Sequence, residues 1–205
     1  MASVISAGST IDVSSASASV STRGVLASAE LSTASGTVAV EQVTGDVGAQ
    51  SASGTIQLGT VGGETRLRTA SGSMHVATAT GPCRASSASG SLDLGWAGHD
   101  VDAQSASGSI TVRDAVRGRI AVDTTSGRVT IGVRRGTLVW LDLTSVSGRT
   151  RSDLTPDEPG ATDEADTGAA EEPLEIRVRT VSGSITVAPS AASAGARSHD
   201  RRQPA

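Results

Sequence analysis

The sequence of 205 residues contains no phenylalanine, tyrosine, lysine or asparagine, and its only large aromatic residues are Trp96 and Trp140. A buried core must therefore consist of valine, isoleucine, leucine and alanine, which favours a thin interior over a wide globular one. All 17 basic residues are arginines, and the net charge of -4 is too small to indicate a polyanionic partner for the chain as a whole.

Cys83 is the only cysteine, which excludes an intramolecular disulfide and a cysteine-based zinc cluster. No run of about 18 apolar residues occurs, so no transmembrane helix is expected. The first eight residues lack the basic leader and apolar segment of a secretory signal. We therefore expect a cytoplasmic protein, or one of the cell envelope if the natural chain begins upstream, because residues 8–13 already resemble the middle of a repeat.

The chain is rich in one tetrapeptide, Ser-Ala-Ser-Gly with close variants, and each copy precedes an alternating apolar run. Ala18 takes the glycine position of a degenerate first copy, and later copies end at Gly36, Gly54, Gly72, Gly90, Gly108, Gly127, Gly148 and Gly183. Successive copies are 18, 18, 18, 18, 18, 19, 21 and 35 residues apart. A period of about 20 residues is typical of a solenoid, so one repeat domain is predicted over residues 4–187.

Each 18-residue unit divides into two nine-residue halves, most of which begin with a glycine that we number place 1. Places 3 and 5 are apolar, as in Val38 and Val40, whereas places 2 and 4 are mostly polar. This alternation predicts one strand per half, with one face buried. Each strand should pair with its equivalent one turn later. The sequence thus predicts an all-β, right-handed, single-stranded parallel β-solenoid (β-helix) with 18-residue coils.

The corners between strands carry small residues. Place 8 is mostly alanine, including the alanine of Ser-Ala-Ser-Gly, and we expect it to point inward. Glycine at place 1 is expected to supply a positive φ, and the serine and threonine hydroxyls to cap exposed backbone. Such hydroxyl columns also resemble arrays that bind ice, but local hydrogen bonding at turns explains them more simply.

The repeat is interrupted near its C-terminal end. Three extra residues precede Gly148, and the register places Trp140 in the inward place 5 column, which predicts a widened coil. Arg134 occupies place 8, which indicates a remodelled corner. Residues 152–173, rich in aspartate and glutamate, are predicted to form an acidic disordered insertion loop, and residues 188–205 a disordered tail.

A Ser-His-Asp set can be drawn on one predicted strand face. His75 and Asp93 occupy the same outward column one coil apart, and Ser73 lies two residues before His75. A flat strand face offers no pocket and no oxyanion donors, so we favour a polar surface contact and predict no catalytic residue. Arg84 and Asp102 should likewise form a surface ion pair.

Other chemistry is weakly indicated. The aspartate ladder of calcium-binding β-rolls is missing, so no metal or cofactor is predicted. Ten arginines lie between residues 113 and 179, but without interleaved aromatics they do not favour nucleic acid. Cys83 falls in an inward column, as expected for an inert core thiol. The residues predicted to contact a partner are Trp96, at a corner between two glycines, with His75, Asp93, Arg134 and Arg135.

The [Ser/Thr]-x-Ser-Gly-x-apolar-x-apolar units over residues 8–187 resemble the bacterial β-strand-repeat, adhesin-like proteins also called toastrack domains, whose function is largely unknown. This resemblance implies a right-handed β-solenoid and a binding or scaffolding role rather than catalysis. It carries over no catalytic residues. This chain differs from the family pattern because it shows no membrane anchor or export signal, which argues against adhesion at the cell surface.

Three functions remain open at this point. The first is a non-enzymatic interaction or scaffold module that binds an unidentified protein partner. The second is a polysaccharide-acting β-helix enzyme, which a groove lined by clustered aspartate, arginine or aromatic side chains would favour. The third is a self-assembling structural protein, because open coil ends leave unpaired strand edges.

Overall fold

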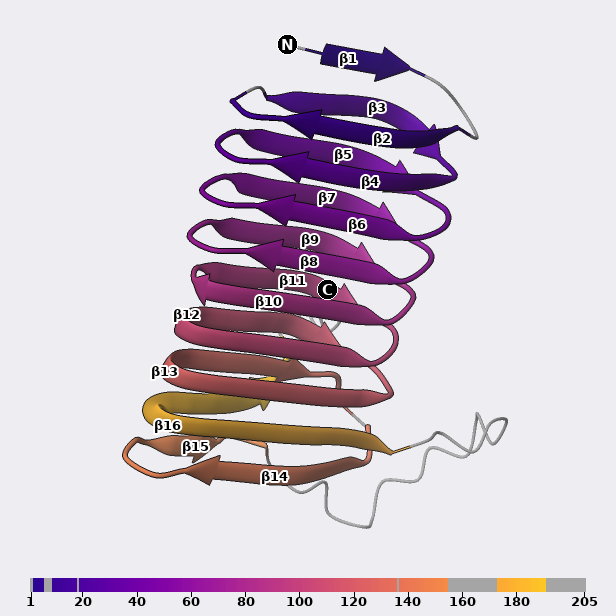
Figure 1. The fold of residues 1–205 in the computed structure, drawn as a ribbon. Coiled ribbons are helices and arrows are strands. Elements are labelled where there is room, and N and C mark those ends of the chain that lie inside the picture. Colours follow the sequence, from indigo (N-terminus) through magenta and orange to yellow (C-terminus); the bar gives the residue numbers. More distant parts are fainter. Residues whose placement is uncertain (1, 6–8, 18, 136, 155–172, 191–205) are drawn as a thin grey trace, which may run out of the picture.

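The computed structural model describes residues 2–5, 9–17, 19–135, 137–154 and 173–190, and these residues form strands and no helix. The strands stack into an elongated rod of flattened coils (Figure 1). Their bounds are β1 Ala2–Ile5, β2 Thr10–Ser15, β3 Val20–Leu26, β4 Ser28–Thr33, β5 Thr37–Val43, β6 Val47–Ser51, β7 Thr55–Val61, β8 Thr65–Thr69, β9 Ser73–Ala79, β10 Cys83–Ser89, β11 Ser91–Ala97, β12 Val101–Ala115, β13 Arg119–Val133, β14 Val139–Ser145, β15 Thr150–Ser152 and β16 Leu174–Pro189.

The strand pairing confirms a parallel β-solenoid with coils of about 18 residues. In the pairing of β5 with β7, Val38 lies opposite Ile56, one repeat further along the chain. We call one side of the rod face A; it contains β1, β3, β5, β7, β9, β11 and β15. The other side, face B, contains β2, β4, β6, β8, β10 and β14, while β12, β13 and β16 turn a corner and contribute to both.

The core is a thin apolar column between the two faces. Places 3 and 5 point inward as predicted, and residues such as Ile56, Leu58 and Leu94 are almost fully buried. Cys83 belongs to this column, and burial raises the pKa of its thiol to about 12. The thiolate is therefore scarce near neutral pH, as expected for an inert core residue.

The spatial order of the last coils differs from their order in the sequence. Strand β16 pairs with β13 along one edge and with β14 and β15 along the other. The segment after residue 173 therefore lies between two coils that precede it in the chain, and β14 and β15 form the lower end of the rod (Figure 1). A simple continuation of the repeat would have placed β14 directly beside β13.

This order also explains the three extra residues before Gly148. The connection from β13 to β14 must pass the whole height of the coil that β16 occupies, so it needs more chain than an ordinary corner. The predicted inward position of Trp140 is wrong. Trp140 lies opposite Glu175 in an outward column and is 51% exposed, while Leu141 and Leu143 take the inward places.

The Ser-Ala-Ser-Gly corner is arranged differently from its prediction. The alanines of this motif, Ala52, Ala70, Ala88 and Ala106, are exposed, so they do not fill the corner. The first residue of the motif points inward instead, as Ser51, Thr69, Ser87 and Ser105 show. The hydroxyls of these four have no hydrogen-bond partner among the described residues, which contradicts the predicted capping role. In the other half of the repeat, place 8 is buried as predicted, for example at Val61 and Ala79.

Close packing between coils, rather than a positive φ, explains most place 1 glycines. A Cβ on Gly72 would lie 2.0 Å from the carbonyl oxygen of Gly54, one coil earlier. Gly54 and Gly90 meet the same obstacle, and none of these three has a positive φ. Gly118, at the corner where one residue is inserted, does have a φ of 91°. That corner therefore uses left-handed backbone of the kind that glycine tolerates best, as does Gly24 in β3 with a φ of 100°.

The corner that precedes Arg134 is remodelled as predicted. The pairing of β12 with β13 shifts register after Val112, so that Val133 rather than Arg134 lies opposite Ala115.

Most of the predicted insertion loop and tail, residues 155–172 and 191–205, lies outside the described residues. Within the part of the chain that is described, no helix has the length and apolarity needed to cross a bilayer.

Candidate functional site

A groove of about 830 Å³ runs over the upper coils of face B. It arises at Gly48, which has no side chain in an outward column where the neighbouring coils carry Glu30 and Arg66. The carboxylate of Glu30 extends over this gap, since a Cβ on Gly48 would lie 2.0 Å from Glu30 Oε2. The groove is lined mainly by charged and amide side chains, including Glu30, Asp46, Gln50, Glu64, Arg66, Arg68, Arg84, Asp102 and Gln104.

Glu64 organises the centre of the groove. Arg66 donates hydrogen bonds to both of its carboxylate oxygens, at 2.5 and 3.1 Å, and Arg84 donates to Oε1 from the next coil. The backbone N–H of Glu64 donates to Asp46 Oδ1 at 2.8 Å. Three coils are thus tied together through one residue, Glu64. These contacts also show that the predicted pair of Arg84 with Asp102 is wrong, because Arg84 turns toward Glu64.

Among the charged and amide side chains of the lining, Glu30, Gln50 and Arg68 have no polar partner within the described residues. All three are exposed, and Gln50 and Arg68 lie opposite each other on adjacent strands β6 and β8. The Glu30 carboxylate accepts hydrogen bonds, the Gln50 amide both donates and accepts them, and the planar Arg68 guanidinium donates them. The groove therefore has a fixed, internally paired centre and free hydrogen-bonding groups beside it.

The predicted pair on face A is present but is organised by a third residue. Asp93 lies opposite His75 in the register, with 3.7 Å between His75 Nδ1 and Asp93 Oδ2. Arg113 also binds Asp93 through both carboxylate oxygens, with 2.8 Å between Nε and Oδ1. These hydrogen bonds lower the pKa of Asp93, and the charges of Arg113 and His75 act in the same direction.

The possible catalytic triad finds no support in this geometry. Ser73 is exposed and no hydrogen bond joins it to His75 among the described contacts, and Asp93 is held mainly by Arg113. The described residues also contain no group of three or more histidine, cysteine, aspartate and glutamate side chains that could hold a metal ion. The arrangement of His75, Asp93 and Arg113 is a cross-strand polar cluster.

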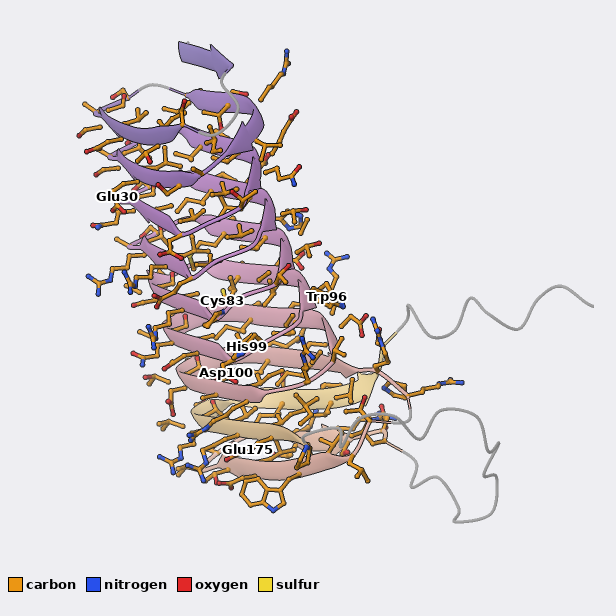
Figure 2. All side chains as sticks on the ribbon, turned by 90° about the vertical axis from the view of Figure 1, so that its right-hand side faces the viewer. Glu30, Cys83, Trp96, His99, Asp100 and Glu175 are labelled. Atoms are coloured by element: carbon orange, nitrogen blue, oxygen red, sulfur yellow. The ribbon has the colours of Figure 1, made fainter. Side chains whose placement is uncertain are left out.

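Trp96 and Arg134 lie at a shared corner on the side of the rod opposite the groove. Figure 2 shows Trp96 and Glu30 on opposite sides. The Trp96 ring covers Gly98, where a Cβ would lie 2.4 Å from it, and Trp96 is half-buried. Asp114, opposite Trp96 in the register, is buried and receives a 2.6 Å hydrogen bond from Arg134. Arg135 is exposed beside this corner.

All five residues predicted to contact a partner thus lie on face A or at its corner, and none lines the groove on face B. The signal for the groove was present in the sequence. The place 4 column of face B contains Gly48 between long charged side chains, which is a gap in an otherwise continuous outward row. From that column we predicted a surface ion pair of Arg84 with Asp102 and the absence of an aspartate ladder, but no groove.

A comparison of the sequence with models of known protein families gives a match that agrees with the stacked-coil fold. The model of the family described as Toastrack DUF4097 matches residues 5–188. The chain belongs to this toastrack family. The toastrack match covers nearly the whole rod, including the inserted strand β16, and it describes a domain of unknown function. Comparisons with curated proteins and with solved structures found no match.

Proposed function

We propose that this toastrack domain is a non-enzymatic interaction module that binds an extended polar segment of a partner protein in the groove of face B. The observation that carries the proposal is the groove itself, with its centre fixed around Glu64 and its free groups at Glu30, Gln50 and Arg68. A polypeptide presents donors and acceptors along its length, and these groups complement it. Because the groove lies on hydrogen-bonded strands, little conformational entropy is lost when a partner binds, as expected for a scaffold.

The test is site-specific photo-crosslinking in cells of the source organism. A photoreactive residue in place of Gln50 should capture a defined protein, and the same residue in place of Gln57, exposed on face A, should not. Arg68→Glu should weaken capture, while Arg128→Glu makes the same charge change on face A and should leave it unchanged. Equal capture from both faces, or no effect of Arg68→Glu, would contradict the proposal.

A second candidate is action on a polysaccharide, because the groove is lined by several carboxylates and glycoside hydrolysis uses a pair of them. Against it, both oxygens of Glu64 are occupied by Arg66 and Arg84, which leaves this carboxylate poorly placed to transfer a proton. A screen of polysaccharides for depolymerisation separates the two. Release of reducing ends that is lost on Glu30→Gln would favour the enzyme.

A further inference from the structure

The lower end of the rod is an open end of both sheets. Among the described strands, β14 and β15 each pair with β16 alone, so the outer edge of each lacks a neighbour in the part of the chain that is described. These two strands end face B and face A respectively. Unpaired strand edges present rows of N–H and C=O groups that favour pairing with another strand.

The same end exposes apolar side chains. Leu138 is 71% and Trp140 51% exposed, whereas core residues in the middle of the rod are almost fully buried. Leu138, Val139 and Trp140 line an open hollow of about 540 Å³ together with Pro173 and Glu175. Behind it, Leu141 and Leu143 occupy inward places but are only partly buried, because none of the described coils covers them from below.

The described carboxylates around this end are paired with arginines of the rod. Arg177 donates to Asp142 at 3.1 Å, and Glu175 lies 3.8 Å from Arg119 and 3.9 Å from Arg177. A copy of the chain approaching the end therefore meets carboxylates that are neutralised by neighbouring arginines. Like-charge repulsion between the described carboxylates of two such ends is therefore small.

We infer that this end is the interface for a second copy of the chain, with β14 and β15 paired to the same strands of the other copy. The cross-section has two open strands and an exposed core between them, and another copy has the same shape. A two-fold axis perpendicular to the two sheets places face A of one copy beside face A of the other, and likewise for face B. Each strand then meets its own equivalent in the opposite direction, so both sheets continue by antiparallel pairing. Because the symmetry is two-fold, the complex is a closed dimer. A single peptide strand would cover only one edge and leave the core exposed.

This inference does not depend on the groove, which lies over the upper coils, so the two proposals can fail separately. The end is also a consequence of chain topology rather than of where the sequence stops, since β14 and β15 precede β16 in the chain. The interface would bring Trp140, which points outward on β14, and the neighbouring Leu138 against the edge strand of the other copy, and large aromatic side chains that become buried in this way contribute strongly to binding.

The experiment measures molar mass by sedimentation equilibrium over a range of concentrations of the full chain. The wild type should be a dimer that dissociates on dilution. Leu138→Glu combined with Trp140→Glu should raise the dimer dissociation constant by about 30-fold or more. Val146→Glu, at a residue 79% exposed on the corner of the same coil, is the matched control and should change it little. Circular dichroism shows whether each variant keeps its strands.

Fluorescence provides a second measurement, because Trp96 and Trp140 are the only tryptophans. In a Trp96→Leu variant, the emission of Trp140 should shift to shorter wavelength as concentration rises. A wild type that stays monomeric at every concentration would overturn the inference, as would a Trp140 emission independent of concentration, which would mean that the chain covers its own end. A mass that grows without limit would overturn the closed dimer, since it indicates head-to-tail stacking.

Discussion

At the corners that end in Gly54, Gly72 and Gly90, the glycine Cα faces the carbonyl oxygen of the equivalent glycine one coil earlier, and the inward hydroxyl packs beside it. Ser51 Oγ lies 2.7 Å, and Thr69 Oγ1 3.0 Å, from the Cβ position of the glycine three residues later. The corner is thus too crowded for a larger residue at either place. A short inward side chain followed by glycine satisfies both restrictions, which explains why the motif repeats with so little variation.

Gly72→Ala tests this crowding. The new Cβ would lie 2.0 Å from a backbone oxygen that cannot move without displacing the neighbouring coil. We expect a loss of about 1–3 kcal/mol in the free energy of unfolding, measured by urea denaturation. Ser71→Ala, on the exposed neighbour, is the control and should change it by less than about 0.5 kcal/mol. Equal urea midpoints for the two variants would show that the corner can relax.

Thr69→Val tests the buried hydroxyls. Thr69 is buried and its Oγ1 has no partner among the described residues, so folding removes this hydroxyl from water without a compensating hydrogen bond. Valine has nearly the same shape, and we expect a gain of about 1 kcal/mol in the free energy of unfolding. A loss of stability in the urea titration would mean that the hydroxyl is satisfied, for instance by an ordered water.

The Asp93 cluster predicts a pH-dependent effect of Arg113→Ala. The hydrogen bond from Arg113 is the main reason that the pKa of Asp93 lies below its ordinary value of 3.8. A carboxyl with a depressed folded pKa stabilises the fold above its unfolded pKa and loses that contribution as the pH falls through the folded value. Arg113→Ala should cost less than about 1 kcal/mol at pH 7, because the pair is largely exposed.

That cost should disappear at a pH well below 3.8, where Asp93 is protonated in both variants. A carboxyl chemical-shift titration of Asp93 gives the pKa directly, and it should rise toward the ordinary value in Arg113→Ala. Arg128→Ala, on the same face without a described carboxylate partner, is the control. An unchanged titration curve of Asp93 would exclude Arg113 as the cause.

At the scale of elements, the insertion of β16 between β13 and β14 is the feature that a repeat alone does not predict. β16 is held by parallel ladders on both of its edges, and it buries Ile176, Val178 and Ile185 completely. A chain that stacked its coils in sequence order would satisfy the same inward pattern. The choice depends on the connections, since the segment between β13 and β14 is long enough to skip one coil.

Pairs of engineered cysteines distinguish the two stacking orders in a Cys83→Ala background. Arg179 lies opposite both Asp123 and Thr144, so Arg179→Cys should form a disulfide with Asp123→Cys in one variant and with Thr144→Cys in another. Asp123→Cys with Thr144→Cys should not, because strands two coils apart are separated by about twice the 4.8 Å spacing. A disulfide in this last variant, detected by mass spectrometry of the monomer, would contradict the insertion.

At the scale of the whole molecule, the rod is a one-dimensional stack in which each coil contacts mainly its two neighbours. Its stability should therefore approximate a sum of coil and interface contributions, and damage should stay local. The two sides also differ in kind. Face B carries the charged groove, while face A carries the Asp93 cluster and the Trp96 corner.

Leu94→Ala tests this locality. Leu94 is fully buried in β11, and its truncation should cost about 2–5 kcal/mol. Hydrogen exchange should show the greatest loss of protection in β9, β11 and β12, with little change in β4 or β16. The control is Gln57→Ala, a truncation on the surface of face A. Equal loss along the whole rod would show that it unfolds as one cooperative unit instead.

The family resemblance, the parallel solenoid, the 18-residue coil and the inward columns were all predictable from the sequence, because a period of two within a fixed repeat specifies which side chains share a core. Three features required the tertiary structure. The inserted order of β16 depends on how far connections reach, the exposure of the motif alanines depends on the bend at each corner, and the groove depends on where the side chains around Gly48 turn. Repetition determines local register, but contacts between coils decide what the surface presents.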